Sequence, residues 1–337
     1  MFTVSLYHYT IPFTETVLGK TEKEGVIMKI IDDSRHTVYG DISILPSNNT
    51  ITITDIVNQV KSYNPEIEFE NQPLYPCVIF GIESAYLSLM AKLKGTNIRH
   101  YLNPNAPEKI RLNTLIQGST DRCLTTAKQA IAMGYTHLKL KVGHRAPEDD
   151  INLINDIIKI LPKGSFLRLD ANRQWDITTA IKVGKSINSD CIEYIEDPTS
   201  EYSEHAAFYK ETGISVAWDK IFRDYPSLDL NTYPEVSTIV IKPSLMGSLS
   251  QCLTLCQSIQ SLGKTVVISA AFESAVGIST LANMAASIAP ETVHGLDTGR
   301  YLSENLLPHD LDIKEGYFYF NDSHTQLNTR LLTSLEI

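Results

Sequence analysis

From about residue 111 onward, short β-rich segments recur at a regular spacing, and this repeat constrains the fold more than any other feature of the sequence. Steps of roughly 25 residues separate neighbouring segments, which is the length that one strand, one helix and two loops require. Most of the intervening stretches carry an amphipathic helix pattern. The segments are RLNTLIQG (111–118), HLKLKVG (137–143), FLRLDAN (166–172), CIEYIEDP (191–198), ISVAWD (214–219), TIVIKPS (238–244), TVVISAAFE (265–273) and VHGLDT (293–298). Eight such segments predict an α/β fold whose strands close into a (β/α)8, TIM-like barrel.

An open, doubly wound sheet is the alternative architecture for the same alternation. Dinucleotide-binding sheets of that kind carry a glycine-rich turn after their first strand. No such fingerprint follows RLNTLIQG, so the closed barrel is favoured.

Residues 1–110 do not share the repeat and predict a separate α+β capping domain. They begin with strand-like runs and continue with helical patterns near ITDIVNQVKSY and CVIFGIESAYLSLMAKLKG. The barrel domain is then expected over 111–305. The remaining segment, 306–337, is expected to return to the capping domain, with EGYFYFN (315–321) as the pairing strand.

Charge and cysteine content exclude several functional classes. A net charge of −10 and a pI near 5.4 argue against nucleic-acid or anionic-membrane partners. No run approaches the roughly 18 apolar residues of a membrane helix, and the first residues lack the pattern of a secretion signal. Cys252 and Cys256 share an apolar helix stripe and are interpreted as core residues rather than metal ligands. These features predict a cytoplasmic protein and give no indication of oligomeric state; the site residues described next predict a small-molecule carboxylate as its partner.

Charged side chains stand at the ends of five successive barrel segments. In a barrel these strand ends converge on one mouth, where active sites are built. Lys139 and Lys141 alternate with apolar residues in HLKLKVG and therefore share one face of their strand. The set comprises Lys139, Lys141, Asp170, Glu196, Asp219 and Lys242.

Three carboxylates gathered in one place repel each other unless a cation lies among them. Hard oxygen ligands without histidine or cysteine select Mg²⁺, with Mn²⁺ as a possible substitute. The ligands would be Asp170, Glu196 and Asp219. The alternative is that each acid is only the N-cap of the following helix.

A metal ion at this position would give the neighbouring lysines a role in proton transfer. A lysine in a dry barrel mouth beside a divalent cation loses its proton more readily and can act as a base. Lys141 is nearest the strand end and is the predicted base, Lys139 is its positively charged neighbour, and Lys242 faces them from the opposite side. Such a site fits the removal of a proton α to a carboxylate. Alone, the two lysines of HLKLKVG would equally fit a half-exposed edge strand.

An ordered set of motifs resembles the enolase superfamily, in its muconate-lactonising-enzyme branch. The barrel motifs are LKLKVG, RLDANRQW, YIEDP, VAWDK, IVIKPSLMGSL, ISAAFESAVG and GLDT, and YGDISILPSNN and VIFGIESA resemble capping-domain segments. The resemblance implies that Lys141 is the acid/base, that Asp170, Glu196 and Asp219 hold Mg²⁺, and that Lys242 is the second lysine of the site.

The resemblance also implies a reaction. It is the Mg²⁺-dependent syn elimination of water from 2-succinyl-6-hydroxy-2,4-cyclohexadiene-1-carboxylate to give 2-succinylbenzoate, in menaquinone biosynthesis. Specificity in this family depends on capping-domain loops, here expected near residues 14–20 and 46–50.

The chain departs from the family pattern at two places. Lys220 follows the third ligand where an acidic residue is usual, and Ala270 and Ala271 replace serines. Weaker candidates for substrate contacts have suitable positions along the strands, and for the first of them a structural salt bridge is an equal alternative. These candidates are Arg168, Asn172, Ser269, Glu273 and Ser274.

The same residues are also compatible with other functions. An N-acylamino-acid racemase or dipeptide epimerase would use the same lysines and acids in a two-base mechanism. A Schiff-base aldolase would use one lysine as nucleophile and gives no role to three acids. A non-catalytic barrel would be expected to lose site residues, and none is missing.

Overall fold

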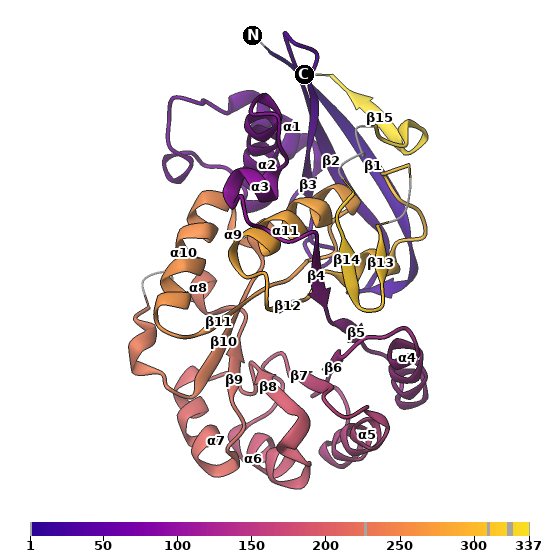
Figure 1. Ribbon diagram of the computed structural model, residues 1–337, viewed down its shortest axis with the longest axis vertical. Helices are drawn as coiled ribbons and strands as arrows, with labels where there is room; N and C mark the ends of the chain where they lie inside the picture. The colour runs from indigo at the N-terminus through magenta and orange to yellow at the C-terminus, as the bar shows by residue number, and fades with distance from the viewer. Residues whose placement is uncertain (1, 226–227, 309–310, 322–325, 337) are drawn as a thin grey trace.

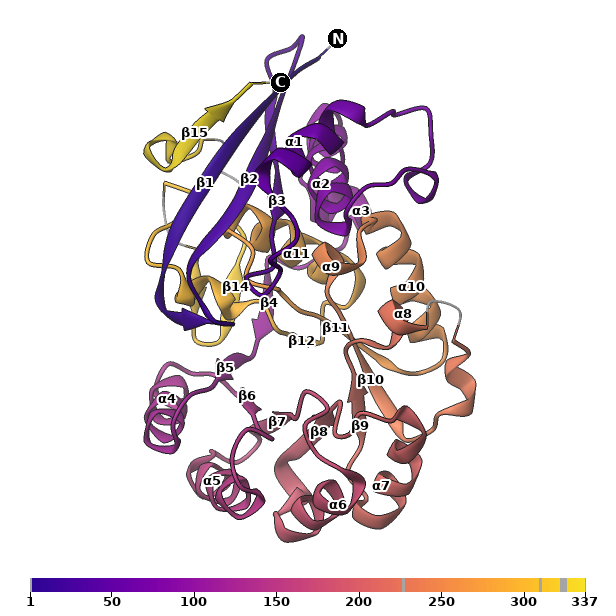
Figure 2. The ribbon, with the colours of Figure 1, turned by 180° about the vertical axis from the view of Figure 1, so that it is seen from behind.

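The middle of the chain forms a barrel of parallel strands surrounded by helices (Figures 1 and 2). The structure is a computed structural model that describes residues 2–225, 228–308, 311–321 and 326–336. Seven strands form one parallel sheet: β5 (Thr114–Ile116), β6 (His137–Lys141), β7 (Phe166–Asp170), β8 (Ile192–Glu196), β9 (Val216–Trp218), β10 (Val236–Ile241) and β11 (Thr265–Ile268).

The eighth strand, β12 (Val293–His294), completes the barrel. Ser269, directly after β11, forms a parallel bridge with Gly295. On its other side β12 pairs in parallel with β4 (Lys109–Leu112), which leads into β5. All eight predicted segments therefore contribute to the barrel, and the predicted fold class is confirmed.

Helices follow the barrel strands in the predicted alternation. They are α4 (Thr120–Ala132), α5 (Pro147–Ile160), α6 (Ile177–Ser186), α7 (His205–Thr212), α8 (Ile221–Asp224), α9 (Pro243–Met246), α10 (Leu249–Ser261) and α11 (Ala275–Ile288). Short 3-10 turns lie at Phe69–Asn71, Ser189–Cys191, Tyr202–Glu204, Leu230–Thr232, Asp297–Tyr301 and Thr329–Leu331. Side chains at the N-caps define several helix starts, because they accept bonds from backbone N–H groups of the first turn. Ser119, Asp176 and Ser248 cap α4, α6 and α10 in this way.

Successive side chains along each strand point to opposite faces, so apolar side chains face the surrounding helices and the candidate site residues face the barrel interior. In β6, Leu138 and Leu140 are fully buried in the hydrophobic core between strands and helices. Lys139 and Lys141 point to the other face, toward the barrel interior and its mouth. Cys252 and Cys256 lie buried on α10, as their apolar stripe predicts.

The N-terminal residues form an antiparallel sheet with helices packed on one face. Its strands are β1 (Phe2–Val17), β2 (Lys20–Asp32) and β3 (Thr37–Ser43), and its helices are α1 (Ile53–Ser62), α2 (Pro76–Leu93) and α3 (Ile98–Leu102). Helix α2 crosses β3 closely at two glycines, since a Cβ on Gly40 would lie 1.9 Å from the carbonyl oxygen of Gly81.

Within the described residues, α2 is the one helix whose length and composition would allow it to cross a membrane. Half of the relevant window is buried inside the protein. Val78 and Ile82 belong to the hydrophobic core beneath the N-terminal sheet. The core helix of a globular protein can have the same length and composition, and the contacts of Val78 and Ile82 show that α2 is such a core helix.

The C-terminal residues divide between the two parts of the molecule. Strand β15 (Leu332–Leu335) pairs with β1 and so returns to the N-terminal sheet. The EGYFYFN segment instead forms β14 (Tyr317–Tyr319), which pairs with β13 (Ile313–Lys314) and with β4. EGYFYFN therefore pairs at the junction of the two predicted domains, and buried Phe318 packs into the barrel core. The domain boundaries after 110 and 305 stay a prediction, and residues 309–310, 322–325 and 337 of the last segment lie outside the described residues.

Candidate active site

Strand register brings the predicted acids and lysines into one layer at the barrel mouth. Lys141 lies opposite Asp170 in the β6–β7 pair, and Asp170 lies opposite Glu196 in the β7–β8 pair. Glu196 in turn lies opposite Ala217 in the β8–β9 pair, two residues before Asp219. Lys242 directly follows β10. Parallel strands in register thus place side chains from distant sequence positions next to one another.

A cavity of about 240 Å³ opens over this layer. Its polar lining includes Lys139, Lys141, Asp170, Asn172, Asp219, Lys220, Arg223, Lys242 and Ser269. Apolar side chains from both parts of the molecule complete the walls; they are Leu18, Leu45, Leu115, Leu245, Phe272, and the two alanines that depart from the family pattern, Ala270 and Ala271. Glu196 is almost fully buried and does not line the cavity.

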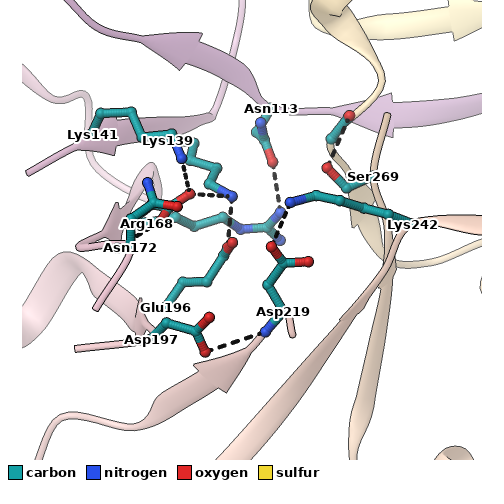
Figure 3. Close-up of polar contacts among 12 residues, drawn as sticks. Asn113, Lys139, Lys141, Arg168, Asn172, Glu196, Asp197, Asp219, Lys242 and Ser269 are labelled. Atoms are coloured by element: carbon teal, nitrogen blue, oxygen red, sulfur yellow. Dashed lines mark hydrogen bonds and ion pairs between the residues drawn. The ribbon is translucent and has the colours of Figure 1, made fainter. Parts of the chain in front are cut away.

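Ion pairs connect the lysines to the three carboxylates (Figure 3). The Nζ of Lys139 lies 2.9 Å from Oδ2 of Asp170 and 2.6 Å from Oε2 of Glu196. The Nζ of Lys141 lies 2.7 Å from the same Asp170 oxygen, and the Nζ of Lys242 lies 2.7 Å from Oδ2 of Asp219. Lys141 and Lys242 reach the carboxylates from opposite sides (Figure 3).

Burial and neighbouring charges shift the pKa values of the site in different directions. Burial alone would lower the pKa of Lys139, but Asp170 and Glu196 outweigh it and raise that pKa well above its ordinary value. Burial opposes ionisation of Asp170, yet Lys139 and Lys141 hold its pKa below the usual range. Burial and the charge of Asp170 raise the pKa of Glu196. For Asp219, Lys242 and Arg223 overcome burial, and its pKa is lowered.

The donor set of these acids fits a hard divalent cation. Oδ1 of Asp219 is buried and has no hydrogen-bond partner within the described chain, which leaves it available as a metal ligand. Among the described residues, no group of three His, Cys, Asp or Glu side chains already has a geometry that could hold a metal. The ammonium groups of Lys139 and Lys242 contact oxygens of all three carboxylates. A bound Mg²⁺ would therefore share or replace these ammonium contacts.

Asn172 and Ser269 lie where a substrate contact requires them, since both line the cavity. Asn172 has a left-handed backbone conformation, with φ 47°, and its N–H donates to Oδ1 of Asp170 at 3.2 Å. The hydroxyl of Ser269 donates to the carbonyl of Gly295 at 3.4 Å. Their roles toward substrate stay predictions.

Arg168 lies on β7 two residues before Asp170 and does not line the cavity. Its guanidinium is fully buried and donates to Glu193 at 2.7 and 3.1 Å. It also donates to Asn113 and to the carbonyl of Val293, both at 2.8 Å. This geometry favours the structural salt bridge over the substrate contact.

Glu273 and Ser274 do not meet the expectation of a substrate contact, because both are fully buried behind the cavity. Glu273 accepts bonds from the hydroxyl of Ser244 and, at 2.7 Å, from the N–H of Ala271. Ser274 caps α11 and donates its hydroxyl to Asp41 of β3 at 2.8 Å. Both residues belong to the interface between the barrel and the N-terminal sheet.

The structure adds cavity residues that the sequence patterns did not single out. Leu18 and Ser47 come from the two capping segments in which specificity loops were expected. Asp297 lies just beyond the eighth barrel strand, so strand-end position was the available signal, whereas Asn113 lies between β4 and β5, where that rule gives no signal. Lys220, noted as a departure from the family pattern, faces the same cavity.

Fold and site together define an enolase-type barrel enzyme. Residues 122–324 match the family described as enolase C-terminal domain-like, and the chain belongs to this family. Solved structures agree in fold across nearly the whole chain. A dipeptide epimerase from Enterococcus faecalis has a TM-score of 0.84 at 18% identity, covering 96% of this chain and 98% of its own. Muconate lactonizing enzyme from Pseudomonas putida gives 0.82 at 16% identity, covering 98% and 99%.

Relatives of known activity narrow the class further. The chain is 33% identical to an o-succinylbenzoate synthase from Pectobacterium atrosepticum, over 88% of this chain and 90% of the relative. It is 32% identical to an o-succinylbenzoate synthase from Edwardsiella ictaluri, over 90% and 92%. The protein is thus an enzyme of the lyase class, similar to o-succinylbenzoate synthases. One member of the superfamily from Roseovarius nubinhibens, with a TM-score of 0.83 at 18% identity over 99% of this chain and 98% of its own, was solved in complex with magnesium.

Proposed function

We propose that this enzyme is a Mg²⁺-dependent dehydratase that converts 2-succinyl-6-hydroxy-2,4-cyclohexadiene-1-carboxylate to 2-succinylbenzoate in menaquinone biosynthesis. The observation that carries the proposal is the placement of Lys141 and Lys242 on opposite sides of three carboxylates in one cavity. The relatives named o-succinylbenzoate synthase support the choice of substrate.

Asp170, Glu196 and Asp219 would hold the Mg²⁺, which when bound offsets the negative charge that develops on the substrate carboxylate. Lys141 takes the proton from the carbon α to that carboxylate onto its Nζ. The electron pair left behind forms the planar enolate, and the ammonium of Lys242 on the opposite side stabilises its charge.

The second half of the elimination uses the same lysine. The C–O bond to the hydroxyl breaks as the ring becomes aromatic, and the Nζ of Lys141 returns its proton to the departing oxygen. Water leaves, and Lys141 is again the free base. Proton removal and hydroxyl departure on the Lys141 side make the elimination syn.

A racemase or epimerase acting on N-acylamino acids is the second candidate. The opposed positions of Lys141 and Lys242 suit a two-base exchange of an α-proton equally well. The epimerase structures resemble this chain at only 18% identity, which shows the fold alone. The synthase relatives at 32–33% identity therefore weigh toward dehydration.

We also propose a cytoplasmic location. All five cysteines are free thiols, and four of them are buried. Free, unpaired cysteines are typical of a reducing compartment.

Purified protein with Mg²⁺ and the cyclohexadiene substrate tests the dehydratase. Loss of the diene absorbance is expected, with inhibition by EDTA and recovery on adding Mg²⁺. Borohydride with substrate should leave the enzyme active, because no Schiff base forms. Racemisation of N-succinylamino acids, followed in parallel by optical rotation, is expected to be slower; racemisation without dehydration would replace the proposal by its alternative.

A further inference from the structure

Lys220 lacks the carboxylate partner that the other lysines of the cavity have, and its neighbour Arg223 has only a distant one that it shares with Lys242. Lys220 and Arg223 line the cavity from the start of α8. No ion pair involves Lys220 anywhere in the described parts of the chain. Arg223 approaches Oδ2 of Asp219 at 3.5 Å, an oxygen that Lys242 already contacts at 2.7 Å.

The charges around the cavity therefore do not balance. Three lysines face three carboxylates in the layer described above, and Lys220 and Arg223 add two further positive charges. Asp297, another lining residue, has Arg300 as its own partner at 3.6 Å. A bound divalent cation would enlarge the positive surplus. Partly buried cations without partners are unfavourable unless a ligand supplies the opposing charge.

The apolar lining of the cavity indicates that the anionic groups of such a ligand are joined by an apolar part. Leu18, Leu45 and Leu115 line the same cavity, together with Leu245 and Phe272. These side chains suit a ring and a short methylene chain. In a ligand with two carboxylates joined by an apolar part, one carboxylate could thus bind among the lysines and acids at the strand ends, and the other could bind Lys220 and Arg223.

We propose that Lys220, with Arg223 beside it, binds the succinyl carboxylate of the substrate, at the far end from the proton that Lys141 removes. This inference rests on the proposed function and deepens it. It makes Lys220 and Arg223 specificity-determining residues, which select a dianionic substrate over one with an uncharged tail.

Binding of the product by calorimetry, in the presence of Mg²⁺, tests this subsite without requiring turnover. The two probes are 2-succinylbenzoate and its derivative in which the succinyl carboxylate is a primary amide. The wild type should bind the diacid at least about tenfold more tightly, because hydrogen bonds between charged groups are strong. Lys220→Gln should remove most of this preference and change the affinity for the amide by less than about twofold.

Matched variants make the test specific to this position. Lys220→Arg should restore the preference, and Lys210→Gln, which removes an exposed lysine of α7, should leave it intact. Arg223→Gln is an independent second variant and should lower the preference by a smaller factor. No preference in the wild type, equal losses for diacid and amide, or an unchanged preference in both Gln variants would overturn the proposal.

The binding test and the dehydration assay can fail independently, so failure of the subsite can be distinguished from failure of the proposed reaction. A preference that depends on Lys220, in an enzyme that does not dehydrate the cyclohexadiene, would reject the proposed function and keep the subsite. Dehydration at normal rates with no such preference would reject the subsite alone.

Discussion

Several non-glycine residues that follow barrel strands have left-handed backbone conformations. They are Asn172 (φ 47°), Arg173 (φ 63°), Asp197 (φ 44°) and Phe272 (φ 65°), and each lies in the loop that follows a barrel strand. Such conformations cost on the order of 1–3 kcal/mol each and persist where the surrounding fold fixes them. They turn the chain away directly after the strand residues that carry the functional groups.

At the residue scale, the unpaired oxygen of Asp219 gives the first prediction. Asp219→Asn removes a charged ligand while keeping the size of the side chain, so the dissociation constant for Mg²⁺ should rise at least about tenfold. Calorimetric titration with Mg²⁺ alone measures it. Asp224→Asn, on an exposed carboxylate of α8, is the matched control and should bind Mg²⁺ as the wild type does. Equal affinities in all three proteins would remove Asp219 from the metal site.

At the element scale, β3 and α11 meet through one buried carboxylate. Asp41 accepts bonds from the hydroxyl of Tyr9 at 2.9 Å and from the N–H and hydroxyl of Ser274 at 2.9 and 2.8 Å. A Cβ on Gly277 would lie 2.8 Å from Oδ2 of Asp41, so only glycine permits this approach. The contact joins the N-terminal sheet to the barrel.

Asp41→Ala should destabilise the protein by about 3 kcal/mol, because it leaves buried donors without an acceptor. Urea denaturation followed by circular dichroism measures the change. Asp156→Ala, which breaks an exposed pair with Lys159, should cost less than about 1 kcal/mol. A loss for Asp41→Ala no larger than that of the control would show that the interface does not depend on this carboxylate.

At the scale of the whole molecule, buried neutral histidines tie stability to pH. His294 is fully buried; its Nδ1 accepts the N–H of Ile268 at 3.1 Å, and its Nε2 donates to the carbonyl of Ala289 at 3.0 Å. Burial lowers its pKa to about 4, as it does for His137 and His205. The unfolded chain binds a proton at higher pH than the folded one. Stability from these residues is therefore complete above about pH 6.5 and is lost as pH falls toward 4.

For His294 alone, the free energy of unfolding should fall by about 2 kcal/mol between pH 7 and pH 5. His294→Gln should lose that share of the pH dependence, whereas His144→Gln, at an exposed position, should retain it. Urea titrations at the two pH values measure the difference. The same pH dependence in wild type and His294→Gln would contradict a neutral, buried His294.

The repeat of strands and helices, the six charged residues of the layer and the buried face of α10 were predictable from local patterns. Each depends on periodicity within one segment or on position at a strand end. The contacts of Ser274 and Arg168 were not predictable in this way. Ser274 bonds Asp41 across 233 residues, and Arg168 bonds Val293 across 125. The strand-end rule indicated which side chains reach the mouth, but not which buried ones have partners in another element.

Removal of the α-proton by Lys141 is the step on which the proposed reaction depends, and the rate of diene loss in Lys141→Ala measures the contribution of this lysine. With saturating Mg²⁺ and substrate, we expect a rate about 10²–10⁴-fold below that of the wild type. Binding of 2-succinylbenzoate should stay within a few-fold, and Lys128→Ala, at an exposed lysine of α4, should react at the wild-type rate. A Lys141→Ala enzyme that dehydrates the substrate as fast as the wild type would show that Lys141 is not the base.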